Sequence, residues 1–406
     1  MQKTFFYIFL LLAGVTFDAC GSNDDNNKDS NSSDNQIETF SPVVVTKTNS
    51  MKVFVHYMPW FETPATNNGS WGQHWTMANC NPEKIDASGK RQIASYYYPL
   101  TGPYASSDST LLDYQCLLMK YSGIDGVMID WYGTQSKNDY ASNKKNTEAI
   151  VKSIEKAGLQ FAIVYEDNTL NGLDDKVSQA RLDIRYLASG FFKSNSYIKI
   201  DAKPLLMIFG PQQISKPEEW NDVFNVLLTK PEFIVLNGNT SKVNNSQYIN
   251  SQGEFLWVNA NPSYSDAKNY SMYIGGAMPG FHDYYKAGGW GNGYTTYDSE
   301  NGALFDRQLS AAKNAGLGWL QVSTWNDYGE GTNIEPTQEY GYQYLVKIQQ
   351  FTGVSYQQSV LENIYRWYQL KGTYSKDKTA NSKLLQCYYY FISLQPDKAK
   401  IIMDKL

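Results

Sequence analysis

The hydrophobic residues of this chain form short apolar runs that alternate with longer periodic segments between residues 50 and 355. Short runs bounded by Gly, Pro or acidic residues predict buried strands, and longer amphipathic segments predict helices. Strands are predicted at 53–58, 126–130, 160–165, 204–209, 233–236, 255–259, 273–278 and 319–324. Helices are predicted at 111–121, 146–157, 174–187, 218–228, 303–315 and 342–351.

The order of these elements predicts the fold class. About eight strands, most of them followed by a helix, over about 300 residues match an α/β fold of the (β/α)8 TIM barrel type. A doubly wound open sheet is the alternative, but no GxGxxG follows the first strand. We therefore expect a barrel at 50–355. Helical patterns at 360–370, 382–394 and 396–406 predict a small C-terminal helical appendage at 356–406.

The first 49 residues have a different composition, which predicts export. Lys3, the apolar run 5–15 and Ala19 match a secretory signal at 1–19, with Cys20 as the lipidated first residue of a lipoprotein. An ordinary signal peptide beside an unrelated cysteine is the alternative. The polar segment 20–49 predicts a disordered tether, and its start resembles the export tag of Bacteroidetes surface lipoproteins. These features predict a lipid anchor in a bacterial outer membrane, with exposure at the cell surface.

Composition narrows the possible functions. A formal net charge of -5 and a pI near 5.4 argue against nucleic-acid binding. Only three His are present, so a His-built metal centre is hard to assemble, and we expect no metal ion and no other cofactor. The wide spacing of Cys80, Cys116 and Cys387 predicts neither a disulfide framework nor a zinc knuckle.

Polar and aromatic residues follow the predicted strands, and a (β/α)8 barrel carries its active site at these strand ends. Sugar rings stack on aromatic side chains, and their hydroxyls need fixed polar partners. A mouth lined by carboxylates, Trp and Tyr therefore predicts a polysaccharide or oligosaccharide ligand. The strand ends present His56, Tyr57, Trp60, Asp130, Trp131, Tyr132, Glu166, His282, Asn326, Asp327 and Glu330.

The most specific segment is Trp325-Asn326-Asp327-Tyr328-Gly329-Glu330. Glycosidic cleavage needs one group that protonates the leaving oxygen and another that acts on the anomeric side. Asp327 and Glu330 are therefore the expected catalytic pair. An acidic pair on a solvated helix face is the alternative, but Trp, Asn, Tyr and Gly surround this pair. Glu335 precedes Pro336, which predicts a supporting or helix-capping role.

This motif resembles the eighth-strand pattern of glycoside hydrolase families 99 and 71. Residues 326, 328–332 and 334–336 follow family 99, with Asp327 in place of a Glu, and residues 325–330 follow family 71. The segments 56–61, 72–75, 130–133 and 279–283 also resemble family 99, with His282 in place of an acid. Family 99 contains endo-acting α-mannosidases and α-mannanases, and family 71 contains α-1,3-glucanases.

The resemblance implies that Glu330 is the general acid and Asp327 the base. The base acts on the substrate's own 2-hydroxyl in family 99, with retention, whereas the corresponding group of an inverting enzyme activates water. The sugar-binding candidates are Tyr57, Trp60, His74, Asp130, Trp131, Tyr132, Glu166, His282, Asn326 and Glu335. For His56, His74 and Trp60 a purely structural role is the alternative.

Two functional hypotheses follow from these residues. The first is an endo-acting glycosidase for an α-linked glycan, with α-mannan as the first substrate and α-1,3-glucan as the second. The second is a non-catalytic glycan-binding lipoprotein on a degenerate barrel, which the changes at Asp327 and His282 motivate. A metal-dependent hydrolase ranks third because the chain contains so few His.

Overall fold

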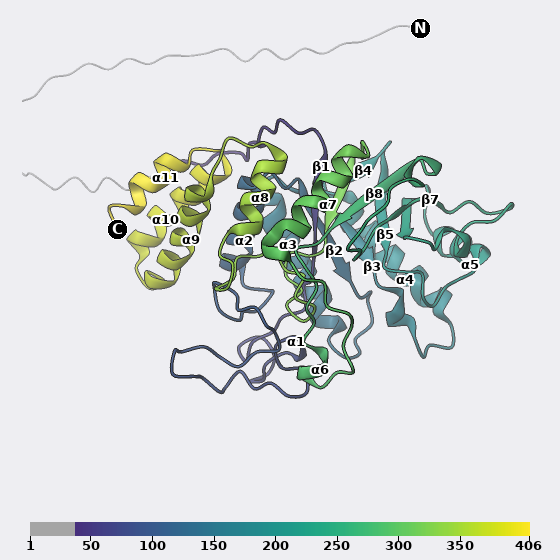
Figure 1. Ribbon diagram of the computed structural model, residues 1–406, viewed down its shortest axis with the longest axis horizontal. Helices are drawn as coiled ribbons and strands as arrows, with labels where there is room; N and C mark the ends of the chain where they lie inside the picture. Colours follow the sequence, from purple (N-terminus) through teal and green to yellow (C-terminus); the bar gives the residue numbers. More distant parts are fainter. Residues whose placement is uncertain (1–36) are drawn as a thin grey trace, which may run out of the picture. The chain divides into compact units, whose positions relative to one another are not determined.

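The computed structural model describes residues 37–406, in which nine strands form one closed sheet (Figure 1). Eight strands are parallel, in the order β1-β2-β3-β5-β6-β7-β8-β9, and β9 pairs with β1 to close a barrel. β4 adds only an antiparallel pairing with β5. The strands are β1 (Lys52–Tyr57), β2 (Gly126–Trp131), β3 (Gln160–Tyr165), β4 (Lys199–Ile200), β5 (Lys203–Ile208), β6 (Glu232–Leu236), β7 (Ser251–Phe255), β8 (Met272–Ala277) and β9 (Trp319–Val322). The predicted (β/α)8 barrel is confirmed.

Helices cover the outside of the barrel. They are α2 (Ser109–Tyr121), α3 (Tyr140–Ala157), α4 (Lys176–Ser189), α5 (Pro217–Phe224), α7 (Ala303–Asn314) and α8 (Gln343–Thr352). Short turns α1 (Gln73–Thr76) and α6 (Tyr285–Gly288) lie in the long loops after β1 and β8. Within residues 237–271, the connections from β6 to β8 contain 3-10 turns but no α-helix. This sector of the sheet therefore lacks the usual helical cover.

Local sequence determines where these elements begin and end. The Asp108 carboxylate accepts hydrogen bonds from the N–H groups of Thr110 and Leu111, which starts α2. α3 ends at Gly158, whose φ of 73° lies in the left-handed region that favours glycine. Gly126 lets β2 approach β3 closely, because a Cβ there would lie 1.9 Å from the carbonyl oxygen of Gln160.

The seventh strand lies four residues earlier than the apolar run predicted it, since β7 covers Ser251–Phe255 and the prediction began at residue 255. This strand contains polar side chains that are buried, and hydrogen bonds compensate for their burial. The Glu254 carboxylate accepts bonds from Gly238 N and Thr240 N, at 2.9 and 3.1 Å. A rule based on apolar runs cannot detect such a strand. One result is that Trp257 lies beyond the carboxyl end of β7.

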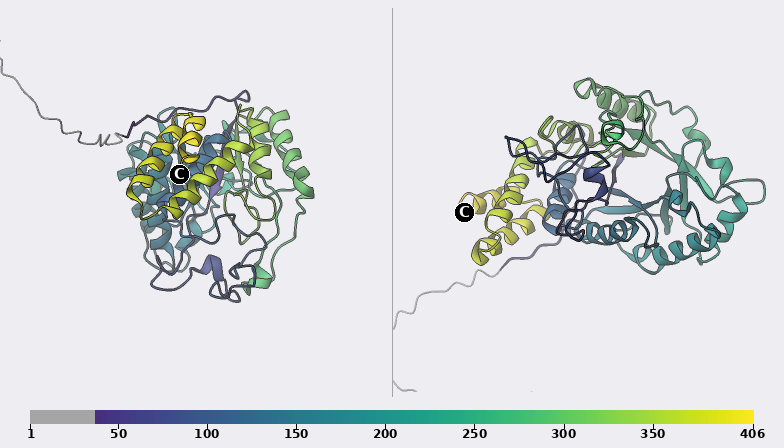
Figure 2. Two further views of the ribbon diagram at one scale, coloured as in Figure 1. Left: turned by 90° about the vertical axis from the view of Figure 1, so that its left-hand side faces the viewer. Right: turned by 90° about the horizontal axis from the view of Figure 1, so that it is seen from below.

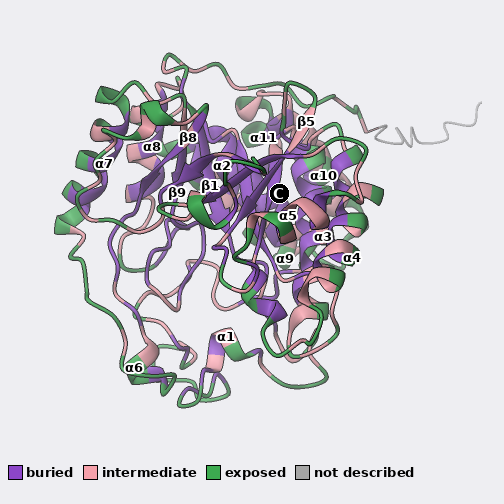
Figure 3. Ribbon diagram, turned by 90° about the vertical axis from the view of Figure 1, so that its right-hand side faces the viewer, coloured by how far each residue is buried: buried purple, intermediate pink, exposed green. Residues whose placement is uncertain are grey.

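The core has one layer between the strands and the helices and a second inside the barrel. Figure 3 shows buried residues along the strands and on the inner faces of the helices. Side chains alternate along a strand, so Phe54 shares the inner side of β1 with His56 and Met58. Phe54 stacks on Trp319, with ring centroids 5.1 Å apart. These rings fill the barrel interior near the N-terminal ends of β1 and β9.

Three further helices, α9 (Gln358–Thr373), α10 (Lys378–Ile392) and α11 (Pro396–Met403), form the C-terminal appendage (Figure 2). α9 packs against α2, where the Tyr114 and Tyr368 ring centroids lie 5.0 Å apart. The Tyr121 hydroxyl also donates a hydrogen bond of 2.9 Å to the Phe391 carbonyl of α10. These contacts attach the appendage directly to a barrel helix.

Residues 37–49 fall within the segment whose composition predicts a disordered tether, but they are docked on the folded unit. Val43 N donates to Ile392 O at 2.9 Å, and Asn49 N donates to Thr352 O at 3.1 Å. The Phe40 ring lies 5.6 Å from that of Tyr390. Part of the predicted tether is thus structured. The predicted signal at 1–19, Cys20 and the rest of the tether lie outside the described residues.

Residues 37–406 also show the state of the cysteines and whether metal-binding clusters or membrane-spanning helices are present. Cys80, Cys116 and Cys387 are buried and free, in agreement with their spacing. Throughout residues 37–406 we find no group of three or more His, Cys, Asp or Glu arranged to hold a metal ion. No helix in the same range is long and apolar enough to cross a bilayer.

Candidate active site

A cavity of about 120 Å³ opens at the carboxyl ends of the barrel strands. The strands of a closed parallel barrel all end at one face, so residues from distant parts of the sequence meet there. Asp327 and Glu330 in the loop after β9 face the same space as residues that follow β1, β2 and β3. The lining consists of His56, Met58, Trp60, Asp130, Tyr132, Glu166, Phe209, Trp257, Tyr285, Asp327 and Glu330.

The loop after β9 holds Asp327 and Glu330 in a tight turn. Asp327 N donates to Thr324 Oγ1 at 2.7 Å, and Glu330 N donates to Asp327 Oδ1 at 2.9 Å. Gly331 has a φ of 66°, and a Cβ there would lie 2.6 Å from the carbonyl oxygen of His282. Gly331 therefore has a geometric purpose, which is to let the loops after β8 and β9 meet.

The two acids of this turn have unequal proton affinities. Burial raises the pKa of Asp327 to about 7, although backbone N–H groups of Glu330 and Gly329 oppose the rise. Burial raises the pKa of Glu330 well above its usual range, and the nearby charge of Asp327 raises it further. The Tyr285 hydroxyl, 3.3 Å from Glu330 Oε1, offsets part of that effect. Asp327 therefore loses its proton before Glu330 does.

Two more carboxyl groups line the cavity, and no Lys or Arg of residues 37–406 does. The pKa of Asp130 is raised well above its usual range by burial and by Asp327. The pKa of Glu166 is raised in the same way by burial and by Asp130. Burial also lowers the pKa of His56 to about 3, so its imidazole is neutral. The cavity is thus rich in uncharged hydrogen-bonding groups at moderate pH, which suits an uncharged polyhydroxylated ligand.

Aromatic rings extend from the cavity toward solvent. Trp60 stacks on His74 with centroids 4.1 Å apart and an interplanar angle of 1°. His74 Nε2 lies 3.0 Å from Asp139 Oδ2, which fixes the imidazole behind the indole. Trp290 is 41% exposed, approaches His74 edge-on at 5.8 Å and lies 6.4 Å from Tyr285. This surface can contact sugar units beyond those in the cavity.

The structure brings together half of the residues that the sequence proposed. Trp60, Asp130, Tyr132, Glu166, Asp327 and Glu330 all line the cavity. His74 lies outside it and supports Trp60. The other proposed residues lie away from the cavity and are Tyr57, Trp131, His282, Asn326 and Glu335.

Tyr57, Asn326 and Glu335 belong to a buried network behind the cavity wall. The Glu335 carboxylate accepts hydrogen bonds of 2.6 to 2.8 Å from Gln115, Tyr104 and Tyr328. The Tyr57 hydroxyl donates to Gln115 Oε1 at 2.8 Å, and Asn326 Oδ1 accepts from Met58 N at 2.8 Å. These groups tie the β9 loop to β1 and have no free position for a sugar. Glu335 caps no helix, because α8 begins only at Gln343.

Trp131 and His282 also lie outside the cavity, and each packs against an aromatic ring of the protein. Side chains alternate along a strand, so Trp131 points away from the cavity that Asp130 and Tyr132 face. Trp131 is fully buried and packs at 5.8 Å on the Tyr186 ring of α4. His282 stacks on Tyr96 at 3.9 Å, outside the cavity. Trp60 and Trp257, rather than Trp131, supply the indole rings that line the cavity.

Five lining residues were absent from the proposed set, although His56 was noted at a strand end. His56 lies on β1 and Met58 follows directly after the strand, two positions further on, so the strand period itself points both inward. Phe209 and Trp257 follow β5 and β7, and the strand-end rule would include both once β7 is placed correctly. Tyr285 lies in a loop turn, and no sequence pattern indicates its position.

A closed barrel with a carboxylate-lined cavity at the carboxyl ends of its strands is the architecture of a glycoside hydrolase, and known proteins agree with this class. The profile of glycosyl hydrolase family 99 matches residues 48–239. A human glycoprotein endo-alpha-1,2-mannosidase-like protein is 23% identical over 317 residues, which cover 69% of this chain and 67% of that protein. The mouse glycoprotein endo-alpha-1,2-mannosidase is 22% identical over 323 residues, covering 70% and 68% respectively.

A solved structure supports the fold. The family 99 endo-alpha-mannosidase of Bacteroides thetaiotaomicron superposes with a TM-score of 0.59 at 19% identity, covering 75% of this chain and 97% of that one. The chain is therefore a glycosidase that resembles glycosyl hydrolase family 99.

Proposed function

We propose that this protein cleaves α-linked mannose glycans within the chain, with α-mannan as its polymeric substrate and α-1,3-glucan as the second candidate. One observation carries the proposal, namely that Asp327 and Glu330 face one small cavity with unequal and raised pKa values. Such a pair supplies a base and an acid at the same pH. The printed names of the similar proteins, which include endo-mannosidases, favour mannose as the sugar.

Glu330 is the proposed general acid. Its Oε2 is buried without a hydrogen-bond partner in the described chain, while Oε1 accepts from Tyr285. A carboxyl group that holds its proton and has one free oxygen is suited to protonate the departing glycosidic oxygen. The bond between this oxygen and the anomeric carbon then breaks as the proton is transferred.

Asp327 is the proposed base. In one route it accepts the proton of the substrate's 2-hydroxyl, whose oxygen attacks the anomeric carbon, and water later opens the anhydro-sugar with net retention. In the other route it accepts a proton from water, which attacks directly with inversion. Asp130 and Glu166 are placed to hydrogen-bond sugar hydroxyls in either route. NMR of the first anomer released decides between the two.

The decisive experiment is incubation of the purified protein with yeast α-mannan, α-1,3-glucan and an α-1,4-glucan, followed by chromatography of released oligosaccharides. We expect release from α-mannan and loss of that release in Glu330→Gln and Asp327→Asn. Glu362→Gln, at an exposed position on α9, is the matched control and keeps full activity. Full activity in the Asp327 and Glu330 variants would refute the assignment. Glycan binding without release from any polymer would establish the non-catalytic alternative.

We also propose that Cys20 carries a lipid that anchors the protein in an outer membrane, with the glycosidase at the cell surface. The signal-like segment before Cys20 and the polar segment after it support this. Metabolic labelling with a fatty-acid probe, compared between the natural sequence and Cys20→Ala, tests the anchor. Equal labelling of both forms would exclude it.

A further inference from the structure

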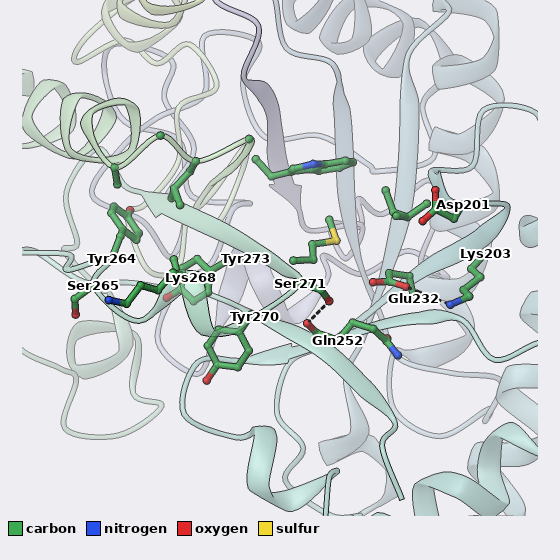
Figure 4. A pocket seen from close by; sticks show the side chains of 18 residues that line it. Asp201, Lys203, Glu232, Gln252, Tyr264, Ser265, Lys268, Tyr270, Ser271 and Tyr273 are labelled. Carbon is green, nitrogen blue, oxygen red and sulfur yellow. Dashed lines mark hydrogen bonds and ion pairs between the residues drawn. The ribbon is translucent and has the colours of Figure 1, made fainter.

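A second and wider pocket, of about 820 Å³, opens at the other end of the barrel (Figure 4). It lies at the N-terminal ends of five neighbouring strands, where Lys203, Glu232, Gln252, Met272 and Trp319 belong to β5 through β9. The candidate active site lies at the carboxyl ends of the same barrel. A strand of six residues spans about 20 Å, so the two pockets are separated by the length of the barrel.

Three tyrosines and Trp319 supply the aromatic part of this pocket. Tyr264, Tyr270 and Tyr273 come from the β7–β8 connection and the start of β8, where no α-helix covers the sheet. Tyr270 and Tyr273 have centroids 5.9 Å apart and an interplanar angle of 31°. The Tyr264 hydroxyl donates to Gly276 O at 3.0 Å, which fixes this connection on the sheet. The partly exposed rings of Tyr270 and Tyr273 therefore lie on an anchored segment.

Across the pocket from these rings, Figure 4 shows hydrogen-bonding side chains, among them Gln252 and Glu232. Glu232 is only 7% exposed, and the Lys203 ammonium lies 4.0 Å from its carboxylate. Gln252 Oε1 accepts a bond of 2.9 Å from Phe233 N, which leaves the amide N–H groups of Gln252 for a ligand. A carboxylate and an amide thus present acceptors and donors side by side.

The charges of the pocket balance. Asp201, Glu232 and Lys203 lie on one side of the pocket and Lys268 on the other, so the lining holds two acids and two lysines. This arrangement gives no net attraction for an anion or a cation, so it favours an uncharged ligand with many hydroxyl groups. Carbohydrates combine such hydroxyls with apolar ring faces that stack on tyrosine.

We propose that this pocket is a second carbohydrate-binding site, in which Tyr270 and Tyr273 stack on sugar faces while Glu232 and Gln252 bond hydroxyls. The assignment of an α-mannan chain as the bound glycan rests on the proposed function. The site itself binds the glycan and performs no chemistry. By holding polymer at the far end of the barrel it raises the effective concentration of substrate around the enzyme.

Affinity gel electrophoresis with yeast α-mannan cast in the gel tests the proposal, with Glu330→Gln in every protein to prevent cleavage. We expect Tyr270→Ala with Tyr273→Ala to weaken the retardation about threefold to tenfold. Gln252→Ala gives a smaller loss and serves as a second variant if the double variant does not fold. Tyr389→Ala, a partly exposed tyrosine on α10 outside both pockets, is the matched control and keeps the retardation.

With the natural Glu330 restored, both pocket variants should hydrolyse a short aryl mannoside with unchanged kcat/KM. Retardation that is equal in all variants, or equally lost in the control, would overturn the second site. If the natural protein cleaves no polymer, the proposed function fails. The same variants in α-1,3-glucan and α-1,4-glucan gels then decide the second site separately, because absence of retardation in every gel would refute it as well.

Discussion

Asp327 and Glu330 are three residues apart and share one turn, yet their surroundings give them different proton affinities. Asp327 accepts backbone hydrogen bonds that stabilise its charged form, whereas Glu330 has one oxygen without a partner in a buried position. The order in which they lose protons therefore follows from the backbone bonds to Asp327 and from the effect of its charge on Glu330. The family resemblance already implied Glu330 as the acid and Asp327 as the base, and the structure supplies a physical reason for that order.

This order predicts the pH dependence of catalysis. Asp327 must be ionised to act as a base, so kcat/KM should rise with pH through about 7. Glu330 must stay protonated, so activity should fall again at higher pH. Glu330→Gln should remove the falling limb and lower kcat about a hundred- to ten-thousandfold. Initial rates from pH 4.5 to 9.5 check this, and a flat profile in the natural protein would contradict it.

Trp290 gives a prediction about substrate length. Its exposed ring continues the aromatic surface of Trp60 and His74 beyond the cavity. Trp290→Ala should raise KM several-fold for a long oligomannoside, through loss of stacking worth about 1 kcal/mol, and leave a disaccharide substrate unaffected. Steady-state kinetics with oligosaccharides of graded length test this. An equal change for every length would show that the ring only supports the loop.

At the scale of elements, the sequence predicted most strands and helices because their apolar periods match simple burial. It misplaced β7, whose polar residues are buried through hydrogen bonds to Gly238 and Thr240. It also assigned Tyr57 and Trp131 to the cavity, because strand ends were listed without regard to side-chain alternation. The network around Glu335 was beyond reach, since it joins residues more than 200 positions apart.

That network predicts a marked difference between two substitutions. Glu335→Leu leaves the donors of Tyr104, Tyr328 and Gln115 buried without an acceptor, at about 1–3 kcal/mol for each unsatisfied group. It should lower the free energy of unfolding and also the activity, because the β9 loop loses its support. Glu335→Gln keeps one acceptor oxygen and should lose less of both. Urea denaturation and kcat measurements on the two variants test this, and equal losses would refute the role of the carboxylate.

At the scale of the whole molecule, the barrel separates two pockets of different character. The cavity at the carboxyl ends is small and acidic, and the pocket at the N-terminal ends is wide and balanced in charge. The acidic cavity makes the stability of the whole fold depend on pH. Burial raises the pKa values of Asp130, Glu166, Asp327 and Glu330, so the fold favours their neutral forms.

The stability of the fold should decrease as the pH rises. A carboxyl group whose pKa is raised by folding stabilises the fold fully below its unfolded pKa of about 4, and that contribution is lost as pH rises through the folded value. The Tm should therefore fall between pH 5 and 8. Asp327→Asn, which cannot ionise, should have a Tm on the order of a few degrees higher than the natural protein at pH 8 and an equal Tm near pH 4.5. Calorimetry across this range checks the convergence, and a constant difference would contradict it.

The docking of residues 37–49 also constrains the order of events during synthesis. Val43 bonds to Ile392, so a ribosome must add about 350 residues before the early segment can reach its partner. The same segment also bonds early partners, since Lys120 donates to Val43 O and Lys47 pairs with Asp125. Its docking can therefore proceed in two stages, in which the contact with α10 is the last to become available.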